Sequence, residues 1–189
     1  MQFFFGDSIL VSPVTDENAT SVSIYLPQDR FYDFAMLAPV DGTGQYVTLS
    51  NVNFTEIPLY IRGGAVLPLR AAGAMTTTEL RAQAFQFVVA PGTDGTATGA
   101  LYIDDGVSIT QDKTTSAKMA YVEGKLTVSG SFDVDVELAS VWFLGIEQAP
   151  TTVSGPGYKP MPFSYDAYCK VLRVQTDSQL YDGFEVTFS

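Results

Sequence analysis

The sequence predicts an all-β protein made of two consecutive antiparallel β-sandwich domains, at residues 1–70 and 71–189. Three observations support this fold class: apolar residues recur at every second position, Asp-Gly and Glu-Gly pairs separate the strand-like runs, and helical periodicity is nearly absent. Short strands joined by tight turns, without crossover helices, are typical of sandwiches and not of parallel sheets.

Period-two alternation is clearest in three runs. Val22, Ile24 and Leu26 alternate with polar or aromatic neighbours, and the same pattern recurs at residues 133–138 and 184–189. One polar face per strand predicts antiparallel sheets that are in contact with water on one side. Residues 118–129 alternate on both sides of a central Glu-Gly pair, which predicts a hairpin with a two-residue turn.

The domain boundary is placed by a change in composition. Small and polar residues at 70–78 interrupt two strand-rich regions, and only residues 78–85 show helical spacing, enough for a turn or two. A domain of about 70 residues is marginally stable alone, because little of its surface is buried on folding. We therefore expect the first domain to pack on a neighbour.

Charge and hydropathy limit the classes of partner. Asp and Glu number 21 against 10 Lys and Arg, so the formal net charge of −11 repels nucleic acid. Apolar runs such as residues 57–60 and 65–67 are far shorter than the roughly 20 residues that span a bilayer. We expect neither nucleic acid nor a membrane as a partner.

The titratable residues do not form a recognisable catalytic or metal site. Histidine is absent, which removes the catalytic triads and metal sites that need imidazole. Asp104 and Asp105 are adjacent on a strand-like run and point to opposite faces, whereas glycosidase carboxyl groups flank one bond. Gly106 favours a turn there, and the spacing from Asp94 to Asp112 matches no calcium loop. We expect no catalytic residue, metal or cofactor in this chain.

Cysteine usage and sequons bear on the compartment. Cys169 is the only cysteine, so a buried thiol is expected, with a bridge to another chain as the alternative. Asn18 and Asn53 begin N-x-S/T sequons, which predict N-glycosylation and a secreted, extracellular protein.

The first residues indicate an interface. Phe3, Phe4 and Phe5 are consecutive aromatic residues that are costly to leave in water, so we expect them to contact a partner. Residues 1–5 lack the basic segment of a signal peptide. We expect either an added initiator Met1 or a downstream piece of a longer protein.

Other aromatic residues are candidates for sugar binding. Tyr158 and Tyr165 follow a Gly-Pro-Gly segment and are candidates for stacking on sugar rings. Trp142 lies between Val141 and Phe143 in an apolar run and is expected in the core.

Three segments resemble the end of a glycoside hydrolase family 31 enzyme, the α-glucosidase family. They are residues 5–14 (FGDSILVSPV), 57–68 (IPLYIRGGAVLP) and 95–106 (GTATGALYIDDG). In that order they look like the segment leaving the catalytic barrel, the strand pair closing the proximal carboxyl-terminal domain, and the start of the distal domain. The resemblance implies that the first few residues are the tail of a (β/α)8 barrel, that residues 1–70 are the proximal domain and that residues 71–189 are the distal one.

The same resemblance implies a role inside a larger enzyme. The chain is expected to be a non-catalytic carboxyl-terminal fragment or small subunit of a secreted, fungal-type α-glucosidase. That enzyme would release terminal α-linked glucose from maltose and starch oligosaccharides by a retaining mechanism, with its carboxylates on an upstream or separate chain. The expected partner is that larger chain, which carries a (β/α)8 barrel and binds most of the carbohydrate substrate.

Two alternatives from other classes remain open. In the first alternative, the chain is a free-standing carbohydrate-binding β-sandwich module. In the second, it is a structural cell-wall protein without a sugar site. Binding of maltose or starch by the isolated chain separates them.

Overall fold

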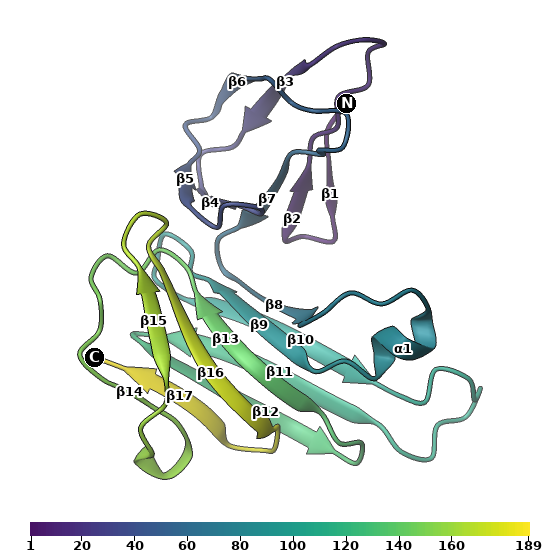
Figure 1. The fold of residues 1–189 in the computed structure, drawn as a ribbon, viewed down its shortest axis with the longest axis vertical. Helices are drawn as coiled ribbons and strands as arrows, with labels where there is room; N and C mark the ends of the chain where they lie inside the picture. The colour runs from purple at the N-terminus through teal and green to yellow at the C-terminus, as the bar shows by residue number, and fades with distance from the viewer.

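The amino-terminal third of the chain forms two small sheets, drawn in purple and blue in Figure 1. The computed structural model describes residues 1–189. A five-stranded sheet has the order β1-β2-β7-β4-β5, and β3 pairs with β6 in a separate two-stranded sheet. The bounds are β1 (Phe3–Phe5), β2 (Ile9–Val11), β3 (Ser21–Leu26), β4 (Arg30–Asp33), β5 (Pro39–Asp41), β6 (Gln45–Ser50) and β7 (Leu59–Arg62). We call these the amino-terminal sheets.

Alternation in β3 places its apolar side chains as predicted. Ile24 and Leu26 are buried, whereas Ser21, Ser23 and Tyr25 are exposed. The buried pair joins Leu10, Phe31 and Tyr60 in a small core between the two amino-terminal sheets.

The remaining strands form one ten-stranded sheet, which we call the sandwich. Its order is β14-β17-β12-β11-β10-β8-β9-β13-β16-β15. The elements are β8 (Ala65–Arg70), α1 (Thr77–Arg81), β9 (Phe85–Ala90), β10 (Ala97–Ile103), β11 (Thr115–Val122), β12 (Lys125–Phe132), β13 (Glu137–Phe143), β14 (Val153–Ser154), η1 (Pro156–Tyr158), β15 (Phe163–Asp166), β16 (Val171–Gln179) and β17 (Phe184–Phe188).

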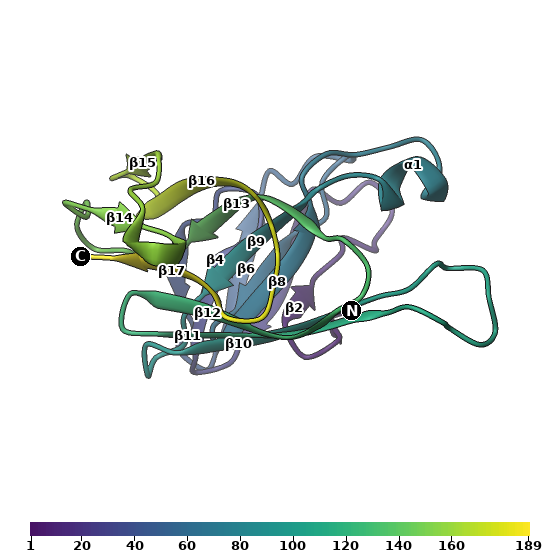
Figure 2. The same ribbon diagram turned by 90° about the horizontal axis from the view of Figure 1, so that it is seen from below.

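This sheet folds over itself into two layers. Figure 2 shows β10, β11 and β12 in one layer and β9, β13 and β16 in the other. The main core, a cluster of 21 buried residues, draws on both layers, with Phe87, Phe143 and Leu126 among its fully buried members. The all-β class and the sandwich are therefore present.

Two strand pairs differ from the antiparallel prediction. β8 pairs with β10 in parallel, with Ala65 opposite Thr98, and β9 pairs with β13 in parallel. The chain reverses after β8 and again after β9, and β10 then lies on the far side of β8, so that β8 and β10 run in the same direction. Alternation within each strand carries no information about this non-local choice.

The chain leaves the amino-terminal sheets and enters the sandwich before residue 70. β8 is antiparallel to β9 inside the sandwich, although its residues fall in the predicted first domain. The chain passes from the amino-terminal sheets to the sandwich at Gly63 and Gly64, where Gly64 has φ +94° and a Cβ on Gly63 would meet the Pro91 carbonyl oxygen. The small and polar residues at 71–76 form a loop between two strands of one sheet.

The predicted hairpin is confirmed. β11 and β12 are paired from Thr115, which lies opposite Phe132, to Val122, which lies opposite Lys125. The two turn residues, Glu123 and Gly124, both have positive φ. The only α-helix is the five-residue α1, in the region where the sequence allowed a turn or two. No helix of the structure is long and apolar enough to cross a membrane.

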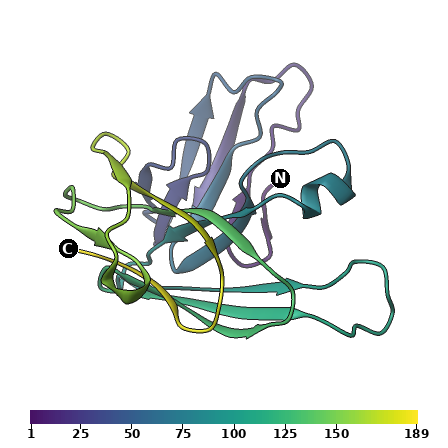
Figure 3. The same ribbon diagram turned by 60° about the horizontal axis from the view of Figure 1, so that its bottom comes forward.

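An apolar cluster joins the amino-terminal sheets to the sandwich. Tyr32, Leu37 and Ile61 contribute from one side, and the sandwich contributes Val88, Ala90, Leu144, Cys169 and Val171 from the other. Figure 3 shows the amino-terminal sheets on the side of the sandwich away from the β10 to β12 layer. The outer face of the β9-β13-β16 layer is therefore partly covered by them.

Candidate functional site

The three leading phenylalanines form β1, an edge strand of the five-stranded sheet. Phe3 and Phe5 lie opposite Val11 and Ile9, and Phe4 lies opposite the buried Leu10. Direct cross-strand partners share a face, so Phe4 is on the face of the small core, while Phe3 and Phe5 are on the opposite face, which Ile61 shares. Phe3, Phe4 and Phe5 are 48%, 40% and 70% exposed. The predicted tail of a barrel stays a prediction.

Two tyrosines that the sequence did not single out are exposed on the outer face of the two-stranded sheet. Tyr25 on β3 pairs with Tyr46 on β6, and their ring centroids lie 5.3 Å apart. The Gln2 side chain donates from Nε2 to the Tyr25 carbonyl oxygen over 2.7 Å, and its Oε1 accepts from the Tyr25 N–H over 2.9 Å. These bonds tie the start of β1 to β3. We call the exposed edge strand Phe3–Phe5 the aromatic surface.

The aspartates considered for chemistry serve turns and ion pairs. Asp104 Oδ1 lies 3.0 Å from Arg81 Nη2 and accepts from the Gly106 N–H over 2.8 Å. Asp105 accepts from the Ser108 hydroxyl over 2.6 Å and from the N–H groups of Val107 and Ser108. These bonds, led by the Ser108 hydroxyl, hold the pKa of Asp105 well below its usual range. Its carboxylate is therefore ionised and is not suited to donate a proton.

Other acidic side chains follow the same local pattern. Asp94 accepts from the N–H and the hydroxyl of Thr96, which lowers its pKa. No group of three or more His, Cys, Asp or Glu side chains is arranged to hold a metal ion.

The two candidate sugar-stacking tyrosines have different surroundings. Tyr158 ends η1 at φ +59° and is 86% exposed. Tyr165 packs against the main core and donates its hydroxyl to the Ile146 carbonyl oxygen over 2.7 Å. Tyr165 is partly buried and its hydroxyl is engaged, so Tyr158 is the more accessible of the two rings.

Trp142 lies outside the main core but packs, partly buried, against the apolar cluster that joins the amino-terminal sheets to the sandwich. Arg173 Cζ lies 5.0 Å from its ring centroid. A bulge between Leu138 and Ser140 places Trp142 on this outer face and not in the main core. Val141 and Phe143, its neighbours in sequence, do lie in the core.

Both sequon asparagines are exposed. Asn18 lies in a turn at φ +57°, and the Asn53 side chain donates to Glu56 Oε1 over 3.0 Å. The thiol of Cys169 is buried between the amino-terminal sheets and the sandwich. Glycosylation at the two asparagines stays a prediction.

Comparison with curated proteins identifies relatives along the chain. A sequence model of the glycosyl hydrolase family 31 C-terminal domain matches residues 1–67. A probable alpha/beta-glucosidase of Neosartorya fischeri is 51% identical over 188 residues, which are 98% of this chain and 21% of the relative. An alpha-glucosidase of Schizosaccharomyces pombe is 35% identical, over 87% of this chain and 17% of its own length. The chain therefore spans about a fifth of the length of these relatives.

Solved structures share the fold over the whole chain. A crystal structure of a glucosidase II alpha subunit superposes with a TM-score of 0.83 at 23% identity, covering 100% of this chain and 24% of the other. A family 31 dextranase of Flavobacterium johnsoniae gives a TM-score of 0.78 at 16% identity, covering 100% of this chain and 26% of its own. The arrangement of both groups of sheets is thus shared with larger proteins. The chain belongs to glycosyl hydrolase family 31, whose C-terminal domain it contains.

Proposed function

We propose that this chain is the non-catalytic carboxyl-terminal part of a secreted family 31 α-glucosidase and that it supports a larger catalytic part. The observation that carries the proposal is the aromatic surface, which lies within the residues matched by the family model. Relatives named as alpha/beta-glucosidase or alpha-glucosidase support the activity of the whole enzyme. In this proposal, the catalytic part releases terminal α-linked glucose with retention, using its own two carboxylates.

The aromatic surface is suited to docking. Phe3, Phe4 and Phe5 form an edge strand, and all three side chains are exposed. Burial of two of these phenylalanines alone would contribute roughly 3–6 kcal/mol before association costs. Aromatic side chains at the centre of an interface commonly dominate its binding energy. The catalytic part is therefore expected to cover this face.

Copurification tests the docking. The Neosartorya fischeri relative, shortened by the segment that matches this chain, is produced together with the chain carrying an affinity tag. We expect the two to copurify, and we expect Phe5→Asp to reduce the recovered partner at least tenfold, because it places a charge in an apolar contact. The melting temperature of the recovered complex should fall in parallel.

A matched control separates docking from folding. Tyr168→Asp changes an exposed aromatic residue in the turn between β15 and β16, which is not part of the aromatic surface. It should leave copurification unchanged. Equal recovery of the partner with Phe5→Asp and Tyr168→Asp, with both variants folded by circular dichroism, would refute the docking role.

Secretion and glycosylation have their own test. Asn18 and Asn53 are exposed and reachable by a glycosyltransferase. When the chain is directed through a yeast secretory pathway, we expect two glycans, with Asn18→Gln and Asn53→Gln each removing one mass step on a gel. An unmodified product would remove the support that the sequons lend to a secreted protein.

The alternative is a free-standing carbohydrate-binding module, which the exposed ring of Tyr158 favours. In that case the isolated chain binds maltose, and Tyr158→Ala weakens the binding in a calorimetric titration. Binding without any partner chain and failure to copurify would together favour this alternative.

A further inference from the structure

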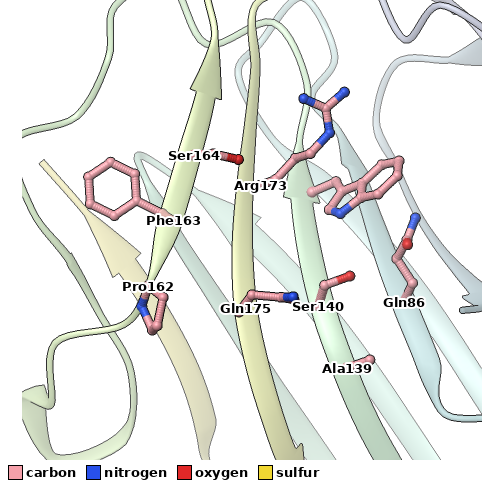
Figure 4. Close-up of a pocket in the computed structure, with 9 residues that line it drawn as sticks. Gln86, Ala139, Ser140, Pro162, Phe163, Ser164, Arg173 and Gln175 are labelled. Atoms are coloured by element: carbon pink, nitrogen blue, oxygen red, sulfur yellow. The ribbon is translucent and has the colours of Figure 1, made fainter.

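A polar groove lies on the outer face of the sandwich, beside the cluster that joins it to the amino-terminal sheets. The hollow measures about 500 Å³, and its walls come from β9, β13, β15 and β16. Figure 4 shows labelled side chains from these neighbouring strands around it. Gln86, Ser140, Trp142, Arg173 and Gln175 are the lining residues used below.

Strand register brings these residues into two rows. Ser140 lies opposite Gln86 on one side and Gln175 on the other. In the next row Trp142 lies opposite Arg173. Cross-strand partners share a face of the sheet, so all five side chains rise from the same surface. The groove is therefore a regular array and not a chance gap between loops.

A bulge in β13 creates this array. Leu138 points into the core, and strict alternation would also turn Ser140 and Trp142 inward. The register shift between Leu138 and Ser140 adds one residue relative to β9, which turns Ser140 and Trp142 outward. The bulge thus places a hydroxyl and the only tryptophan of the chain in the groove.

The polar groups of the groove are free to bind. None of the hydrogen bonds in the structure involves the amide groups of Gln86 and Gln175, the Ser140 hydroxyl or the indole N–H of Trp142. A glutamine amide carries two donors and an acceptor with two lone pairs, and a hydroxyl both donates and accepts. Such a set matches a ligand whose groups also donate and accept, as sugar hydroxyls do.

The charge of the groove favours a neutral ligand. The chain carries 21 acidic residues, yet none lines this hollow. Its single charged residue, Arg173, has the Asp166 carboxylate 3.8 Å from its guanidinium group. A cation therefore finds no ligand there, and an anion finds a charge that is already partly compensated.

We propose that this groove binds a neutral oligosaccharide of glucose, in addition to whatever the catalytic part binds. The row of amides and hydroxyl groups contacts sugar hydroxyls, and the indole of Trp142, with Arg173 lying over its ring, closes one end of the row. The choice of glucose rests on the proposed function, whereas the neutral, hydroxyl-rich class rests on the groove itself.

The sole tryptophan provides the test in the unmodified chain. Maltotriose and cellotriose are titrated separately to millimolar concentrations while the emission of Trp142 is followed. We expect a saturable change with at least one of them, and the effective sugar identifies the preferred linkage. No saturable change with either sugar, in a chain that is folded by circular dichroism, overturns the proposal and leaves the docking test unaffected.

Variants locate the binding. Gln175→Ala and Gln86→Ala should each raise the dissociation constant of the effective sugar about two- to tenfold, the range that one hydrogen bond spans. Gln45→Ala, an exposed glutamine on β6, and Tyr158→Ala should leave the dissociation constant unchanged. If neither groove variant weakens binding, or if Tyr158→Ala removes it, the sugar lies elsewhere and the groove is not the site.

Discussion

Tyr32 on β4 donates its hydroxyl to the carbonyl oxygen of Pro91 over 2.9 Å, and this bond joins the amino-terminal sheets to the loop after β9. The ring is buried, and burial raises the pKa of the hydroxyl. The chain makes room for it at Gly145, where an added Cβ would lie 2.8 Å from the Tyr32 oxygen. The two groups of sheets are therefore held together by a hydrogen bond as well as by apolar contact.

Tyr32→Phe should destabilise the chain by about 0.5–1.5 kcal/mol, because the partly buried Pro91 carbonyl loses its donor. Urea unfolding followed by circular dichroism measures the change in midpoint. Tyr46→Phe removes an exposed hydroxyl and should leave the midpoint unchanged. Equal midpoints for Tyr32→Phe and wild type would show that the bond contributes nothing to the joint.

Gly99→Ala should destabilise the sandwich by about 1–3 kcal/mol, the cost of overpacking. A Cβ at this position would collide with the Val66 carbonyl oxygen, where β10 runs beside β8. Gly73→Ala is the matched control, because a Cβ there would meet no atom within 4 Å. Thermal unfolding should separate the two variants clearly; similar melting temperatures would contradict the close approach of β8 and β10.

Asp105 should make the stability of the loop between β10 and β11 depend on pH. The Ser108 hydroxyl and two N–H groups lower the pKa of Asp105 in the folded chain. The stabilisation that its carboxylate provides is therefore complete above the unfolded pKa of about 3.9, and it is lost as the pH falls from there toward the lower folded pKa. We expect Asp105→Ala to be less stable than wild type at neutral pH, with the difference narrowing below about pH 4.

Comparing variants removes the general effect of acid in this experiment. Asp135→Ala changes a carboxylate that takes part in no ion pair of the structure. Its unfolding midpoint should track that of wild type at every pH. A gap between Asp105→Ala and wild type that stays constant down to pH 2 would contradict the assigned bonds.

Cys169 should react slowly with a thiol reagent in the folded chain. It is the only cysteine and is buried against the amino-terminal sheets. Ellman's reagent should report one thiol promptly in urea and only a slow reaction in buffer. Cys169→Ser supplies the background signal, and prompt reaction without denaturant would show that the two groups of sheets separate readily.

Local patterns in the sequence predicted the strands well. Alternation placed Ile24 and Leu26 inside, and the Glu123-Gly124 pair closed the hairpin that was expected. Each of these features depends on residues close in sequence. The parallel pairing of β8 with β10 depends on residues about 30 positions apart and has no local signature.

The candidate sites were predicted unevenly for the same reason. Consecutive phenylalanines signalled an interface because exposed apolar residues are costly wherever they occur. Tyr25 and Tyr46 become neighbours only through the pairing of β3 with β6. Gln86, Ser140 and Gln175 form a row only through strand register, after a bulge that no residue type announces.

The fold of the sandwich also limits self-association. Because its two layers belong to one continuous sheet, only β14 and β15 are outer strands. β14 has two residues, and its Val153 carbonyl already accepts from the Met161 N–H over 3.0 Å. β15 has four residues and follows Pro162, which has no N–H to offer. The sandwich, although it is rich in strands, therefore presents only short, interrupted edges to its own copies, which works against fibril-like stacking through this part of the chain.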